Sequence, residues 1–402
     1  MMEKKLQIII SFLVYGVLAF AQSSPYVVGR SGMENGDYHS AIINLSKALE
    51  NRPSDLDALY YRGLCYFNEK NYDAAKKDFL QLNRQRKAMG SLMLAKIEVR
   101  LNHTGLAINY LREHLSSSYK LPEKEILLDP DLMKLEKKEE WKALWQEREW
   151  YSSSDRDLQE AVYLASTGNT LDAINILNML DKKGFKRSQV NQELAIIYSK
   201  TGNKKAALES IEKAVASDSR NTTALRYSIE YLAENDEYEK ALESAKKLKR
   251  LAPDDFDAYF LIARVESRTG NYEDAVETMD TYLELFPANP EAYNQLGEIH
   301  FENKKFLNAI SSFNKAIELY TGDPVYFFNR GRAYSETRTF KYANQDFSMS
   351  LDLDPGNAET WYYKGKVDAA LGNKEDACYD FRMAFRYGKY EARDYLDSNC
   401  NE

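Results

Sequence analysis

Small and apolar residues recur in this chain every 34 positions, which indicates a repeated structural unit. The marker of the period is an alanine, found at Ala173, Ala207, Ala241, Ala275, Ala309, Ala343 and Ala377. The residue four positions later is apolar in every case: Leu177, Ile211, Ala245, Met279, Phe313, Phe347 and Phe381. Because residues four apart share one face of an α-helix, each pair predicts a helix with an apolar face.

A first helix is predicted before each of these alanines, and a turn joins the two. The residue twelve positions upstream of the alanine is small in all repeats but one: Ala161, Ala195, Ile229, Ala263, Gly297, Gly331 and Gly365. Glycines that suit the turn are Gly168, Gly202, Gly270 and Gly372, and Pro253, Pro287 and Pro355 follow the second helix. Small residues let two helices approach closely. A lone helical hairpin cannot bury its apolar face, so the hairpins are expected to stack.

This pattern resembles the tetratricopeptide repeat (TPR) family, whose repeats are 34 residues long. The match is closest in residues 358–391, through Trp361, Gly365, Gly372, Ala377, Phe381 and Ala384. The resemblance implies an all-α fold, a TPR superhelical solenoid of stacked helix-turn-helix repeats.

About ten repeats are expected, in two blocks. Residues 22–121 form an N-terminal block of three less regular repeats, and residues 154–391 form a C-terminal block of seven. Residues 122–153 break the register as a helical insertion, and residues 392–402 are expected to cap the array.

The insertion is rich in tryptophan, with Trp141, Trp145 and Trp150. Two interpretations are open. The indoles cap the exposed ends of the two repeat blocks, or they form a docking site for a partner, since tryptophan is enriched at binding hot spots.

Residues 1–21 have the pattern of a secretory signal. Lys4 and Lys5 precede an apolar run, and Ala19-Phe20-Ala21 suits cleavage before Gln22. The alternative is an uncleaved anchor, although the run is shorter than the roughly 20 residues that a spanning helix needs. We expect an exported protein without stable membrane insertion after cleavage, in the periplasm or cell envelope.

Composition and motifs point away from catalysis. The net charge of −8 argues against non-specific binding of nucleic acid. The four histidines, His39, His103, His114 and His300, have no metal-ligand spacing. No phosphate-binding, dinucleotide-binding or nucleophile motif is present. We therefore expect no catalytic residues, no metal and no cofactor.

The three cysteines are Cys65, Cys378 and Cys400. Cys378 and Cys400 are candidates for a disulfide that ties the last segment to the final repeat. The alternative is that Cys378 is a small core residue.

In the TPR family, the first helix of each repeat lines a concave groove that binds partners. Counting Trp361 as the fourth residue of its repeat, the groove positions are the second, fifth, sixth and ninth. The resemblance implies the following groove residues: Tyr60, Tyr61, Arg226, Tyr227, Phe260, Arg264, Phe328, Asn329, Arg332, Tyr362, Tyr363 and Lys366. Alternatively, some of these rings pack against the neighbouring repeat. Asn294 and Glu298 stand where a chaperone-tail clamp would need Lys and Asn, so that clamp is not indicated.

These observations predict an exported, non-enzymatic scaffold that binds one or more proteins or peptides. Two alternatives remain: an envelope-polymer-processing enzyme with a site on residues 122–153, and a membrane-tethered regulator if the signal is retained.

Overall fold

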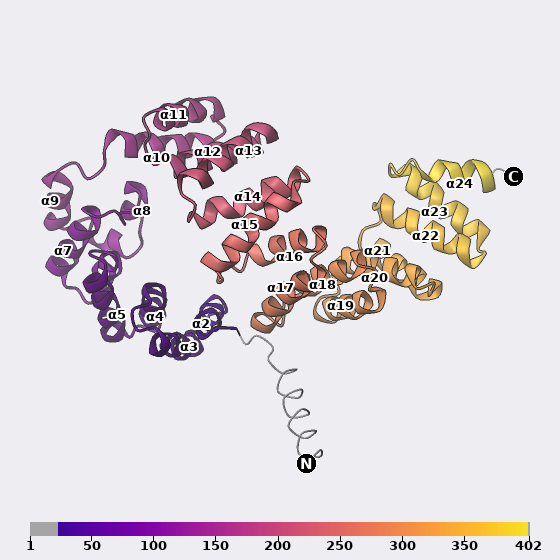
Figure 1. Cartoon of the computed structure of the whole chain (residues 1–402), viewed down its shortest axis with the longest axis horizontal. Helices are drawn as coiled ribbons and strands as arrows, with labels where there is room; N and C mark the ends of the chain where they lie inside the picture. The colour runs from indigo at the N-terminus through magenta and orange to yellow at the C-terminus, as the bar shows by residue number, and fades with distance from the viewer. Residues whose placement is uncertain (1–22, 401–402) are drawn as a thin grey trace, which may run out of the picture. The chain divides into compact units, whose positions relative to one another are not determined.

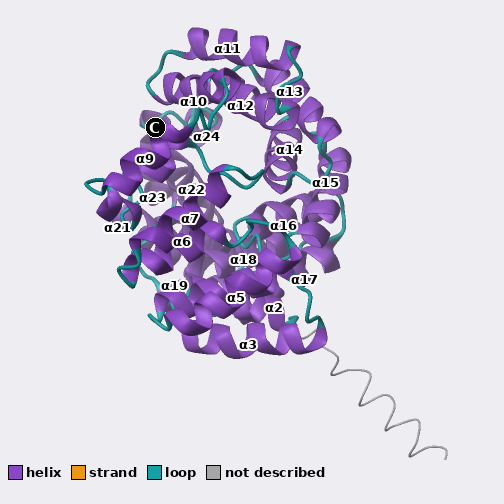
Figure 2. Ribbon diagram, turned by 90° about the vertical axis from the view of Figure 1, so that its left-hand side faces the viewer, coloured by secondary structure: helices purple, strands orange, loops and turns teal. Residues whose placement is uncertain are grey.

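A computed structural model describes residues 23–400, and this part of the chain is helical without strands (Figure 2). The predicted signal segment, residues 1–21, lies outside the described residues. Within residues 23–400 no helix is both long enough and apolar enough to cross a bilayer. The all-α prediction is confirmed.

The chain divides into two compact units, and the boundary along the sequence lies between Ser217 and Asp218. The helices of the first unit are α2 (Pro25–Glu34), α3 (Tyr38–Asn51), α4 (Leu56–Asn68), α5 (Tyr72–Gln85), α6 (Ser91–Arg100), α7 (Thr104–Leu115), α8 (Glu123–Leu127), the 3₁₀ turn η1 (Leu132–Leu135), α9 (Glu139–Glu147), α10 (Ser153–Ser166), α11 (Thr170–Lys182), α12 (Arg187–Lys200) and α13 (Lys204–Ser217). Those of the second are α14 (Thr222–Glu234), α15 (Tyr238–Leu251), α16 (Ala258–Arg268), α17 (Tyr272–Leu285), α18 (Pro290–Glu302), α19 (Phe306–Leu319), α20 (Pro324–Glu336), α21 (Phe340–Leu353), α22 (Ala358–Leu371), α23 (Lys374–Arg386) and α24 (Ala392–Asn399).

Outside the insertion, consecutive helices pair as antiparallel hairpins (Figure 1). Each hairpin packs on the next within its unit, except that α6 and α7 pack on η1 and α9 of the insertion. Polar residues cap the first helix of many hairpins: the side chains of Asp55, Asn221 and Asn289 each accept a backbone N–H of the first turn, at 3.0 to 3.1 Å. Such caps satisfy donors that the helix itself leaves unpaired. Many of the hairpins therefore begin at a side-chain cap, whereas α6, α12 and α16 have none.

The turn inside each hairpin places one residue in the left-handed region. Gly168, Gly202, Gly270 and Gly372 hold this place, as the sequence predicts. The equivalent place in other hairpins belongs to larger residues with positive φ: Lys70, Asn102, Asp236, Lys304 and Arg338. The turn is thus set by the stacking of its two helices, and glycine is not required for it.

The repeated small and large positions pack against each other. A Cβ added to Gly297 would lie 2.4 Å from a ring carbon of Phe313, and one added to Gly331 would lie 2.8 Å from a ring carbon of Phe347. Both rings are buried, as are the marker alanines. The periodic residues are therefore the contact between the two helices of one hairpin.

Buried ion pairs join the same two helices in several hairpins. Arg62 donates two hydrogen bonds to Asp78, at 2.8 and 2.7 Å. Arg330 likewise donates two hydrogen bonds to Asp346, which lies sixteen residues after it, at 2.8 and 2.6 Å. These bidentate pairs fix the register of the first helix against the second.

The insertion packs on the end of the third hairpin. Ile126, Leu132 and Leu144 share one core with residues of α6 and α7. On the other side, Arg156 of α10 forms ion pairs with Glu123 and Glu149 of the insertion, each at 3.9 Å. The insertion therefore contacts hairpins before and after it and lies inside the first compact unit.

Candidate functional site

An aromatic cluster occupies groove positions of α20 and α22 in the second unit. The ring centroids of Phe328 and Tyr363 are 5.6 Å apart, and those of Tyr362 and Tyr363 are 6.1 Å apart, both edge-to-face. The exposed ammonium group of Lys366 lies 5.2 Å from the centroid of Tyr363 and 5.7 Å from that of Tyr362. The cluster presents ring surface and a cation together, which suits contact with a peptide.

Polar groove positions of α18 and α20 continue this surface. The guanidinium of Arg332 lies 4.3 Å from the ring of Phe301 and 5.6 Å from that of Phe328. Burial, reinforced by Glu302, raises the pKa of Glu298, and Arg332 partly offsets this effect. Arg332 and Glu298 are thus opposite charges on adjacent first helices.

Asn329 is buried, so it does not present its amide to a ligand. Its Nδ2 donates to Oδ1 of Asn294 at 3.0 Å, and Arg332 donates to its Oδ1 at 3.4 Å. Its place in the predicted groove set is corrected: Asn329 aligns its neighbours and is not itself a contact surface. The reason is that its helix face is covered by α18.

The remaining groove residues of the second unit make local contacts on α14 and α16. Arg226 forms an ion pair with Asp255 at 3.2 Å, and Tyr227 stacks on Tyr231 at 5.8 Å. Phe260 packs edge-on against Tyr282 at 5.0 Å. Arg264 is exposed.

Tyr60 and Tyr61 belong to the first unit, where they are half-buried neighbours with centroids 5.5 Å apart. Tyr60 also packs edge-on against Phe79 at 5.8 Å, and burial raises its pKa. The guanidinium of Arg30 lies 3.6 Å from the centre of the Tyr61 ring. These contacts fit the alternative interpretation that some rings pack against neighbouring repeats.

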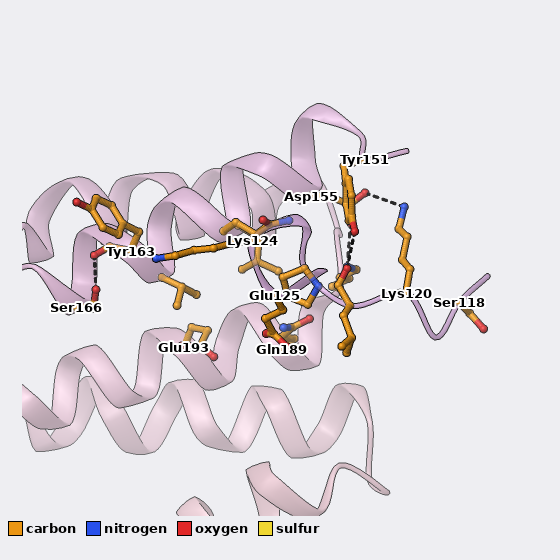
Figure 3. A pocket seen from close by; sticks show the side chains of 16 residues that line it. Ser118, Lys120, Lys124, Glu125, Tyr151, Asp155, Tyr163, Ser166, Gln189 and Glu193 are labelled. Carbon is orange, nitrogen blue, oxygen red and sulfur yellow. Dashed lines mark hydrogen bonds and ion pairs between the residues drawn. The ribbon is translucent and has the colours of Figure 1, made fainter. Parts of the chain in front are cut away.

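A pocket of about 600 Å³ lies between the insertion and α10 and α12 (Figure 3). Most of its helical wall consists of groove positions of two repeats that the predicted set omits: Asp155, Leu158, Gln159, Val162, Gln189 and Glu193. Tyr163, Ser166 and Lys186 complete this wall from other positions. The other wall is the segment 118–125 with Tyr151. Extending the positional rule to repeats 154–187 and 188–221 finds the helical wall from sequence. The insertion wall has no such signal.

Hydrogen bonds fix the insertion wall in place. Lys120 donates to the carbonyl of Trp150 at 2.6 Å. The hydroxyl of Tyr151, labelled in Figure 3, donates to the carbonyl of Leu121 at 2.7 Å. The backbone N–H of Leu121 donates to Nε2 of His114 at 3.1 Å. The pocket is therefore preformed, because its loop wall is held at three points.

The charges that line the pocket are unequally paired. The carboxylate of Asp155 forms an ion pair with Nζ of Lys186 at 2.9 Å and a longer one with Nζ of Lys120 at 3.7 Å. Burial alone would raise the pKa of Asp155, but bonds from Lys186 and Ser152 outweigh it and lower the pKa to about 2. Burial raises the pKa of Glu193, and Lys200 offsets this only in part.

The repeats of this chain match known proteins in sequence and in fold. A family model described as "Tetratricopeptide repeat" matches residues 28–84 and 260–324. A crystal structure of a tetratricopeptide repeat protein from Parabacteroides merdae aligns with a TM-score of 0.52 and 21% identity, over 62% of this chain and 99% of that one. The chain is a tetratricopeptide repeat protein.

Other comparisons add little beyond the fold. The C-terminal part of a TPR repeat-containing protein from Cytophaga hutchinsonii is 19% identical, over 60% of this TPR chain and 99% of that one, with a TM-score of 0.46. A model for ChAPs (Chs5p-Arf1p-binding proteins) matches residues 161–283. No curated protein matches this chain.

Within the TPR array, the tryptophans of the insertion are packing residues. Trp141 is 5% exposed and Trp150 is 6% exposed, in the core shared with α6 and α7. Trp145 is partly buried against the same core and packs edge-on against Trp141, with centroids 5.7 Å apart. The docking interpretation is therefore corrected: the indoles cover the end of the third hairpin, because its apolar face has no following repeat.

The structure joins Cys378 and Cys400 in a disulfide, with Cα atoms 5.7 Å apart. It connects α23 to the end of α24. Cys65 is buried and unbonded, and burial raises the pKa of its thiol to about 11. Residues 23–400 contain no cluster of three or more histidine, cysteine or acidic side chains suited to a metal ion.

Proposed function

We propose that this TPR protein is an exported, non-enzymatic scaffold that binds one or more protein or peptide partners through its groove positions. The observation that carries the proposal is the cluster of Phe328, Tyr362 and Tyr363 with Lys366 beside it. Large rings with a cation over them supply contact area and a directional charge, which are features of binding hot spots.

The proposed location is the periplasm or cell envelope of a bacterial-type cell. Two features support it: the signal-like segment at residues 1–21, and the disulfide between Cys378 and Cys400, because disulfides persist in oxidising compartments. Retention of the segment as an anchor would make the protein a membrane-tethered scaffold.

The test is affinity capture from envelope extracts with the mature chain, residues 22–402, followed by mass spectrometry. Three forms are compared: the native chain, the triple variant Tyr362→Ala, Tyr363→Ala, Lys366→Ala, and the single variant Lys366→Glu. Lys366 is exposed, so its replacement leaves the core intact, as a thermal melt would verify. A partner captured by the native chain and lost by Lys366→Glu supports the proposal. A partner retained by all three forms contradicts binding at this cluster.

Cell fractionation with N-terminal sequencing tests the location. A periplasmic protein that begins at Gln22 is expected. A cytoplasmic protein that keeps Met1 would overturn export.

A further inference from the structure

The pocket beside the insertion carries chemistry that the aromatic cluster lacks. It is a closed-sided part of the groove, since segment 118–125 stands opposite the first helices of two repeats. A ligand in it loses contact with water on more than one side. Charge complementarity there counts for more than on an open face.

Some charged side chains in the pocket already have a partner of opposite charge, and others have none among the described residues. Lys120 and Lys186 both pair with the one carboxylate of Asp155, so each of these cations already has an acidic partner. Lys124 lies 5.5 Å from the ring of Tyr163 at the rim. Glu193 has no hydrogen bond or ion pair to another residue in the described part of the chain, although it is half-buried. Glu125, which also lines the pocket, has no close partner for its carboxylate within residues 23–400 either, but it is exposed to water. Glu193 is half-buried and is therefore the carboxylate that gains most from a cationic ligand.

The rest of the lining suits an extended peptide. Val162 and Tyr163 are 41% and 57% exposed, and with Leu121, Pro122 and Leu158 they give an apolar wall. The amides of Gln159 and Gln189 make no hydrogen bond within residues 23–400, so they are available to a peptide backbone.

We propose that this pocket binds a peptide segment of a partner in which an arginine or lysine lies beside an aliphatic residue. The cationic group pairs with Glu193, and the aliphatic side chain lies against Val162 and Tyr163. The proposal rests on the proposed peptide-binding function, but it concerns a separate site. Lys366→Glu should abolish binding at the aromatic cluster, and it changes no residue of this pocket, so the two sites are tested separately.

The test uses fluorescence anisotropy with the mature chain and labelled, end-blocked peptides. The probe is Ala-Ala-Leu-Arg-Leu-Ala-Ala, and the matched peptide carries citrulline, which has the shape of arginine without its charge. We expect the arginine peptide to bind about tenfold more tightly, since a charged hydrogen bond in a partly enclosed site contributes roughly that factor. Glu193→Gln should remove the difference between the two peptides.

The matched control is Glu160→Gln, which removes the same charge from an exposed position on α10 outside the pocket. It should leave the preference for arginine unchanged. Equal loss in both variants would mean that only overall charge matters, and would overturn the proposal. So would equal affinity for the two peptides in the native chain, no binding of either, or tighter binding of a peptide with glutamate in place of arginine, which would point to Lys124.

Discussion

The α-carbon of Gly297 lies against the ring of Phe313, so closely that a Cβ would come within 2.4 Å of a ring carbon. The ring is buried between the two helices of the hairpin α18–α19, with Phe313 only 1% exposed. The contact explains why the sequence keeps a small residue at this place.

Gly297→Ala should therefore lower the stability of the protein. Overpacking of this kind costs about 1–3 kcal/mol in the free energy of unfolding. The measurement is urea denaturation followed by circular dichroism. Gly105→Ala is the matched control, because a Cβ at that helical position meets nothing within 4 Å. It should stabilise by roughly 0.5–1 kcal/mol, and a loss as large as that of Gly297→Ala would contradict the explanation.

Reduction of the disulfide should loosen α24. The two cysteines are 22 residues apart, and closing a loop of that size contributes about 3 kcal/mol in the loop-entropy model. Hydrogen exchange of residues 392–399 should accelerate in the presence of a reductant. Cys400→Ser should exchange fast with or without reductant, and an unchanged exchange rate in the native chain would show that packing alone holds the helix.

Asp380 should make the stability depend on pH. It is buried with Asp368, and the two carboxylates share one cation, Lys364, whose Nζ lies 2.9 Å from each. Asn344 and Asn373 also donate to Asp368. Burial and the hydrogen bond to Asp368 raise the pKa of Asp380 to about 7, although Lys364 opposes the shift.

Because the pKa of Asp380 is higher in the folded chain than in the unfolded one, the folded state binds more protons between about pH 4 and 7. The free energy of unfolding should therefore fall as the pH rises through this range. In Asp380→Asn this contribution is absent, so the difference between variant and native chain should grow in the variant's favour from pH 5 to pH 8. A difference in unfolding free energy that does not change with pH would contradict the raised pKa of Asp380.

His114 should contribute in the opposite direction. Burial, helped by the charge of Lys96, lowers its pKa to about 4, and its Nε2 accepts the N–H of Leu121. Because the unfolded chain binds the proton more readily, stability should fall as the pH drops from about 6.5 to 4. In His114→Leu this contribution should be absent, so the difference in unfolding free energy from the native chain should shrink across that range.

The period carried most of the fold information in the sequence. Alanine, glycine and phenylalanine at fixed spacing identify the contact between helices, because only small residues fit against the rings. Only one wall of the pocket could be predicted from the sequence. Leu158 and Glu193 follow the groove positions, whereas the opposite wall depends on the hydrogen bond that Lys120 donates to the carbonyl of Trp150. That bond joins residues outside the period. Burial of Asn329 and of the insertion's tryptophans also depends on neighbours that no local pattern reveals.

The turn position with a left-handed backbone tolerates different amino acids from one hairpin to the next. Lys70, Asp236, Lys304 and Arg338 take a conformation that costs a residue with a side chain roughly 1 kcal/mol relative to glycine. The packing of the stacked helices offsets this strain, so the position accepts a cation, an anion or glycine without a change of fold. Successive turns can thus acquire different charges one substitution at a time, and the surface that they form can diversify while the repeat itself stays the same.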